Sequence, residues 1–97
     1  MNTVTEIRTK LVKLKEEMHH VFGVSRIEIF GSYVRGEQRE NSDVDVLVEF
    51  DRDVSFLDVA GLQVFLSEQL GIKVDVVLKR SVRWELKEAI FSEAVQV

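Results

Sequence analysis

The segment from Ser55 to Gly71 constrains the fold more than any other part of the chain. Ser55 and Asp58 have the spacing of a helix capping box, apolar residues follow at helical intervals, and Gly71 ends the pattern. This helix connects two apolar runs, residues 44–50 and 72–78, which have the length of buried strands. A helical crossover normally joins parallel neighbouring strands. The sequence therefore predicts that these two strands are adjacent in one sheet.

The first thirty residues predict another helix and another strand. Residues 3–22 carry apolar side chains at alternating spacings of three and four, the pattern of one buried helix face. Thr3 and Glu6 have capping-box spacing, and Gly23 ends the helix. Residues 24–30 then form an apolar run that predicts the first strand.

A last helix, carrying Trp84 and capped by Ser81, completes the predicted elements. Because no proline, repeat or low-complexity linker divides the chain, we expect one domain over residues 1–97. The expected fold class is α/β (α+β): a three-stranded mixed sheet with helices packed on it.

A glycine-serine turn follows the first predicted strand. Gly31 lets the backbone come close to a ligand because no Cβ blocks the approach. If residues 32–35 begin a helical turn, its free N–H groups form an anion site. Ser32 would add a hydroxyl donor and Arg35 a forked cation suited to phosphate oxygens. Phosphate is the anion we expect there.

Three aspartates are candidates for a metal site. Asp43 and Asp45 stand at the head of the run 44–50, with ten residues between Ser32 and Asp43. Alternate residues of a strand share a face, so both point the same way, and Asp75 joins them if the strands are adjacent. Clustered carboxylates repel one another and require a positive partner. Oxygen ligands with open positions suit magnesium carried by a nucleoside triphosphate, and three carboxylates can hold two such ions.

Each of these residues also has a simpler explanation. Asp43 alone could cap a turn, and Asp45 or Asp75 could face solvent, since aspartate often serves turns and edges. Tyr33 could stack on a base or shield the core. Trp84 fits packing or a partner surface better than a base platform. The combination of the glycine-serine turn with three aspartates favours the metal hypothesis.

Composition narrows the classes of function. The chain has no cysteine, which excludes disulfides and thiolate metal sites. Residues 1–15 are charged and periodic, unlike a secretory signal, and no apolar run has membrane-spanning length. With 17 acidic and 13 basic residues the net charge is −4, which disfavours nonspecific nucleic-acid binding. We expect a soluble, cytoplasmic protein without direct contact to membranes or nucleic acids.

The combination of Gly31-Ser32, ten intervening residues, Asp43-Val44-Asp45 and a later strand aspartate resembles the nucleotidyltransferase superfamily that includes DNA polymerase beta. The filled form, Gly-Ser-Tyr-Val-Arg-Gly with Ser-Asp-Val-Asp-Val-Leu-Val-Glu-Phe, looks like its shortest branch. Those are the minimal nucleotidyltransferases (MNT), prokaryotic proteins usually paired with a HEPN-domain partner as a toxin–antitoxin module. The resemblance spans almost the whole chain.

This resemblance implies the nucleotidyltransferase fold, ATP as substrate and two Mg²⁺ ions. The implied catalytic and metal-binding residues are Asp43, Asp45 and Asp75. The implied nucleotide-binding residues are Gly31, Ser32, Arg35 and Ser42. The implied partner is a HEPN ribonuclease toxin, neutralised by transfer of AMP from ATP to one of its tyrosines.

Two other functions stay open from the sequence. The chain could block its toxin by stoichiometric binding, with Trp84, Phe91 and Val95 anchoring the interface. It could instead be a small-molecule nucleotidyltransferase whose acceptor site is completed by a homodimer.

Overall fold

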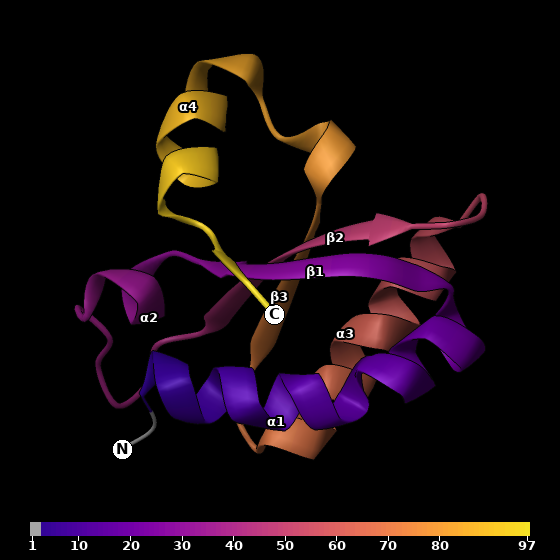
Figure 1. Cartoon of the computed structure of the whole chain (residues 1–97), viewed down its shortest axis with the longest axis horizontal. Coiled ribbons are helices and arrows are strands. Elements are labelled where there is room, and N and C mark those ends of the chain that lie inside the picture. Colours follow the sequence, from indigo (N-terminus) through magenta and orange to yellow (C-terminus); the bar gives the residue numbers. More distant parts are fainter. Residues whose placement is uncertain (1–2) are drawn as a thin grey trace.

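The computed structural model describes residues 3–97, which form helices on a mixed sheet (Figure 1). The helical elements are α1 (Val4–Glu17), η1 (Met18–Phe22, a π-helical turn), α2 (Ser32–Arg35), α3 (Phe56–Leu70), η2 (Lys79–Ser81, a 3-10 turn) and α4 (Trp84–Glu93). The strands are β1 (Val24–Phe30), β2 (Val44–Phe50), β3 (Val74–Leu78) and β4 (Val95–Gln96). Within this described part the strand order is β3-β2-β1-β4.

The predicted ends of the first long helix are confirmed. The Thr3 side chain accepts a hydrogen bond from the Glu6 N–H, and the Glu6 side chain accepts one from the Thr3 N–H. Gly23 ends the helical segment in the left-handed conformation, with φ of 79°. The last turn before it, η1, is π-helical, a detail that the apolar spacing did not predict.

The crossover helix is also capped as predicted, whereas the cap of the last helix is not. Ser55 and Asp58 form a reciprocal capping box at the start of α3, and Gly71 follows its end with φ of 67°. The prediction that Ser81 caps the last helix was wrong. Ser81 belongs to the turn η2, and α4 begins after Arg83 without a side-chain cap. The 3-10 turn η2 comes between β3 and α4, so the N-cap of α4 is Arg83, two residues after Ser81.

The predicted pairing of the two aspartate-bearing strands is confirmed. β2 and β3 are parallel neighbours, and Asp45 lies opposite Asp75 in the register. β1 pairs antiparallel with the other side of β2, which places Phe30 opposite Asp45. The α3 crossover therefore brings the later aspartate beside the earlier pair, as its length and position required.

The sheet has a fourth strand that the sequence did not predict. β4 pairs antiparallel with the free edge of β1, with Val95 opposite Ile29. Side chains of α1 hold this segment, because Arg8 Nε donates to the Gln96 carbonyl at 3.0 Å and Lys15 Nζ donates to the Val97 carbonyl at 3.1 Å. A two-residue strand has too few residues to show a periodic pattern, so only its partners define it.

One face of the sheet carries the core. α1 and α3 lie against this face (Figure 1), and their buried leucines and isoleucine pack on the valines of the central strands. The fully buried members are Ile7, Leu11, Met18, Ile29, Val44, Val46, Leu62, Leu66 and Val74. Tyr33 is 3% exposed and belongs to the same cluster. Of the two roles left open for Tyr33, the structure therefore shows the packing role.

The opposite face of the sheet is covered only in part. α4 lies on this side (Figure 1), and none of its residues is buried. Asp45, Glu49 and Asp75 belong to this face because they alternate with the buried valines of β2 and β3. Among residues 3–97, no helix combines the length and apolar composition that crossing a membrane requires.

Candidate active site

The carboxylates gather where β2 and β3 begin. Asp45 and Asp75 are register partners on neighbouring parallel strands, which run about 4.8 Å apart. Asp43 immediately precedes β2, and its Oδ2 lies 3.7 Å from Lys73 Nζ in a partly exposed ion pair. Asp45 is half-buried and Asp75 is exposed. The register thus places Asp45 beside Asp75. Asp43 comes two residues before Asp45, just ahead of β2.

Burial and neighbouring carboxylates disfavour the charged form of Asp45. The pKa of Asp45 is raised from 3.8 to about 6, first by burial and then by the charges of Asp75 and Asp43. The Arg35 guanidinium opposes this rise only partly. Repulsion of this kind is relieved when a cation binds between the carboxylates. The arrangement is therefore suited to a divalent ion.

The three aspartates offer the kind of ligand that Mg²⁺ prefers, although their side chains are not grouped around one point. Over residues 3–97, no three His, Cys, Asp or Glu side chains are already grouped closely enough to hold a metal ion. The donor set of Asp43, Asp45 and Asp75 nevertheless offers only carboxylate oxygens, which Mg²⁺ prefers. Exposed or half-buried aspartates can rotate at little cost. These three residues would hold the metal, and that role stays a prediction.

Gly31 brings the glycine-serine turn directly against Asp45. Its φ of 85° and ψ of −154° form a conformation that essentially only glycine adopts. A Cβ built on Gly31 would also collide with the Asp45 Oδ2. Ser32 then opens the short helix α2, as predicted. The turn and the first carboxylates are therefore on the same side of the sheet, as the metal hypothesis requires.

Arg35 is engaged by carboxylates of its own chain. Its Nε donates to Glu37 Oε1 at 2.8 Å, and its Nη1 donates to both oxygens of Glu93 at 3.1 Å. Hydrogen bonds to Glu37 and Glu93 raise the pKa of Arg35. The Gly31 N–H also donates to Glu93 Oε2, at 2.6 Å. Of the groups that were predicted to bind a nucleotide, Gly31 and Arg35 thus donate to the carboxylate of Glu93.

Glu93 was not among the residues predicted for the site. This residue ends α4 and lies 62 residues from Gly31 in the chain, so no local spacing links the two. The only signal available was that an acid ends a helix whose favourable last-turn residues are basic. A carboxylate at the negative end of a helix requires another partner, and here the partners are Gly31 and Arg35.

Ser42 has an observed role in the loop that precedes the carboxylates. Its hydroxyl accepts a hydrogen bond from the Arg39 N–H at 2.7 Å, and its N–H donates to the Arg39 carbonyl at 3.0 Å. These two bonds close the turn that leads into Asp43. Nucleotide binding by Ser42 stays a prediction, since its hydroxyl hydrogen can still be donated.

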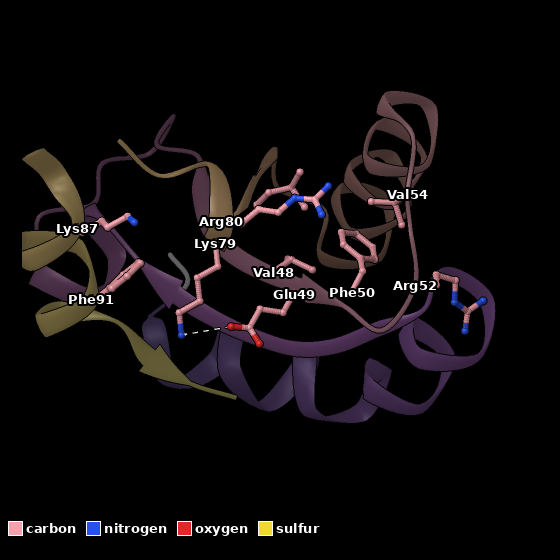
Figure 2. Close-up of a pocket in the computed structure, with 10 residues that line it drawn as sticks. Val48, Glu49, Phe50, Arg52, Val54, Lys79, Arg80, Lys87 and Phe91 are labelled. Atoms are coloured by element: carbon pink, nitrogen blue, oxygen red, sulfur yellow. Dashed lines mark ion pairs between the residues drawn. The ribbon is translucent and has the colours of Figure 1, made fainter. Parts of the chain in front are cut away.

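A pocket of about 360 Å³ lies at the far ends of β2 and β3, next to α4 (Figure 2). Lys79 and Arg80 line it, together with Phe50 and Phe91. Lys79 Nζ pairs with Glu28 at 3.1 Å and with Glu49 at 3.6 Å, and it lies 5.3 Å from the centre of the Phe91 ring. Its first lining residues on the two strands, Val48 and Leu78, come three residues after Asp45 and Asp75, about 10 Å along each strand.

Comparisons with known proteins agree with this geometry. A family model described as nucleotidyltransferase domain matches residues 11–97. The protein adenylyltransferase MntA of Thermococcus cleftensis is 42% identical over 97 residues, which are 100% of this chain and 98% of that relative.

Solved toxin–antitoxin structures are similar in fold. A toxin–antitoxin crystal structure with AMP-PNP aligns with a TM-score of 0.74 at 28% identity, over 91% of this chain and 69% of the other. A mutant of the toxin–antitoxin MntA-HpeT aligns with a TM-score of 0.72 at 26% identity, over 93% and 70%. With its glycine-serine turn against Asp45 and Asp75 in register beside it, this chain belongs to the nucleotidyltransferase domain family.

Proposed function

We propose that this chain is a magnesium-dependent protein adenylyltransferase that acts as the antitoxin of a HEPN ribonuclease toxin, by transferring AMP from ATP to a tyrosine hydroxyl of that toxin. The observation that carries the proposal is the Asp45–Asp75 register pair beside the Gly31 turn. The name of the 42% identical relative supports the reaction, and the toxin–antitoxin structures support the kind of partner.

The site residues would bind the metal ions and the phosphates of ATP. Asp43 and Asp45 would hold both metal ions, and Asp75 would share the one nearest the acceptor. Bound magnesium would neutralise the polyphosphate and lower the pKa of the acceptor hydroxyl. Gly31 and Ser32 would hold phosphate oxygens through their N–H groups and the Ser32 hydroxyl.

The transfer itself needs an aligned hydroxyl and a base. The tyrosine oxygen attacks the α-phosphorus, the bond from that phosphorus to the bridging oxygen of the β-phosphate breaks, and diphosphate leaves. Asp75 would accept the hydroxyl proton. Asp75 is exposed, so an acceptor carried by a second protein can approach it. Positioning and charge neutralisation would supply most of the rate enhancement.

The test is a transfer assay. The chain is incubated with ATP labelled at the α-phosphate, Mg²⁺ and the HEPN protein encoded beside it. We expect label on a tyrosine of the partner, and no label with Asp43→Ala. Asp53→Ala changes an exposed aspartate away from the site and serves as the control. An unlabelled partner, with wild type and Asp43→Ala indistinguishable, would contradict the proposal.

Stoichiometric inhibition is the second candidate, because α4 presents exposed apolar side chains. Trp84 is 79% exposed and Phe91 is 38% exposed. Replacing Asp45 and Asp75 together by Asn separates the two functions. An inhibitor that acts by binding alone would still neutralise the toxin after this change, whereas an adenylyltransferase would lose neutralisation and keep complex formation.

A further inference from the structure

Glu93 occupies two of the donors that could bind a phosphate, the Gly31 N–H and Arg35. Its Oε2 accepts from the Gly31 N–H at 2.6 Å, and both its oxygens lie 3.1 Å from Arg35 Nη1. The Glu93 side chain is only 22% exposed. A backbone N–H at a turn and a guanidinium fork are the same groups that bind phosphate oxygens in proteins. A carboxylate of the chain therefore takes the place of an external anion.

The position of Glu93 is fixed from both sides. On one side α4 ends at Glu93, where the Ala94 N–H closes the helix on the Ile90 carbonyl at 3.0 Å. On the other side β4 pairs with β1, the strand that leads directly into Gly31. A side chain held between a helix end and a paired strand is preorganised for its contact. The Glu93 contact is thus part of the fold.

The contact conflicts with the charge of its surroundings. Glu93 adds a negative charge to a site that already contains Asp43, Asp45 and Asp75, and it is one of the groups that act on Asp45. Arg35 is shared between Glu93 and Glu37. A polyphosphate that arrives at Gly31 and Arg35 would meet a like charge in the place it must occupy.

We infer that Glu93 is a built-in competitor of polyphosphate: it holds the Gly31 N–H and Arg35 while the site is empty, and it must release both when a nucleotide binds. The inference rests on the proposed function and adds a specificity-determining residue to it. Two consequences follow. The phosphate turn stays ordered without ligand, and nucleotide affinity is lower than the same donors would give if they were free.

Glu93→Gln tests this inference, because glutamine keeps the shape and an acceptor oxygen but removes the charge. We expect the Kd of ATP and of inorganic tripolyphosphate, measured by titration calorimetry, to fall about tenfold. Adenosine, which has no phosphate, should show no such gain. Glu88→Gln makes the same charge change at an exposed position of α4 and should leave both values unchanged.

Thermal unfolding gives a second readout. Without ligand, Glu93→Gln should melt at a lower temperature than wild type, because Arg35 and Gly31 lose a charged partner. With saturating ATP the increase in melting temperature should be larger in Glu93→Gln than in wild type, since tighter binding stabilises the folded state more. A variant that shows both changes is folded and has gained affinity for the nucleotide.

Two outcomes would overturn the inference. If folded Glu93→Gln binds tripolyphosphate as weakly as wild type, or more weakly, Glu93 only supports the turn, and the proposed function stands. If neither wild type nor Glu93→Gln binds ATP or tripolyphosphate, the proposed nucleotide site is wrong, and the inference is wrong with it.

Discussion

The two faces of the sheet are built differently. On one face, α1 and α3 cover valines of β2 and β3 that are almost completely buried. On the other face, α4 has no buried residue, Asp45 is half-buried and Asp75 is exposed. The covered face stabilises the fold, whereas the open face exposes acids that repel one another. The buried core and the candidate site are therefore separated by the alternation of side chains along the same two strands.

The helices on the two faces differ in the same way. α3 has a capping box and buries Leu62, Leu66 and Leu70. α4 starts without a side-chain cap and is anchored mainly near its end, by Glu93 and by the strand that follows. Ten residues are fewer than an isolated helix needs to be stable in water. α4 therefore depends on these anchors.

The largest expected effect compares a leucine from each helix. Leu66→Ala should lower the free energy of unfolding by about 2–5 kcal/mol, because Leu66 is fully buried and its truncation leaves a cavity. Leu86→Ala, at a position that is 47% exposed, should cost less than about 1 kcal/mol. Urea unfolding measures both. Equal losses would contradict the difference between the two helices.

The next effect concerns Gly31, which lies against Asp45 on the open face of the sheet. Gly31→Ala should destabilise the protein by about 1–3 kcal/mol, from backbone strain and from the clash with Asp45. Gly36→Ala is the matched control, because Gly36 also has positive φ, of 70°, but a Cβ there meets nothing within 4 Å. The excess loss in Gly31→Ala over Gly36→Ala reports two features of Gly31 together, its backbone conformation and the contact with Asp45. Equal urea midpoints would mean that neither feature matters for stability.

A smaller effect follows from the pKa of Asp45, which is about 6 in the folded protein and 3.8 ordinarily. Between these values the folded state binds the proton more tightly than the unfolded state, so stability falls as the pH rises from about 4 to about 6. After allowance for solvent screening the loss is about 1 kcal/mol.

Asp45→Asn should remove this part of the pH dependence. Urea unfolding at pH 4.5 and pH 7, in the presence of a chelator, should show wild type losing about 1 kcal/mol more than Asp45→Asn between the two conditions. Parallel losses in the two proteins would show that Asp45 does not titrate in this range.

The smallest effect on stability is expected on α4. Trp84→Ala should change the free energy of unfolding by less than about 0.5 kcal/mol, since the side chain is 79% exposed. The same change should weaken binding to the partner toxin about tenfold or more if Trp84 anchors the interface. Calorimetric titration of the toxin measures the second effect. Unchanged affinity would exclude Trp84 from the interface.

Most of the architecture could be predicted because its signals are local. The pairs Thr3–Glu6 and Ser55–Asp58 act over three residues, and the left-handed glycines at 23 and 71 need only their own backbone angles. The parallel pairing of β2 with β3 followed from the length of the crossover between them. The placement of Asp75 beside Asp45 was predictable to the same extent, since the two residues lie on the strands that this crossover joins.

Other features depended on contacts between distant residues. β4 exists because Val95 and Gln96 meet the free edge of β1, and Tyr33 is buried because the core closes over it. Ser81 had the composition of a cap but fell within a turn that the chain makes between β3 and α4. Local sequence patterns could not predict β4, the burial of Tyr33 or the start of α4, because each depends on contacts with residues that are distant in the sequence.

The sequence by itself determined the helices, three of the strands and the spacing of the glycine-serine turn to its aspartates, since these depend on neighbours within a few residues or on one crossover. Only the tertiary structure decided that Gly31 lies against Asp45, that Asp75 is the exact register partner of Asp45, and that Glu93 accepts from the Gly31 N–H and Arg35. The physical reason is that charges and donors act through space, and the distance between two of them is set only when the whole chain has packed.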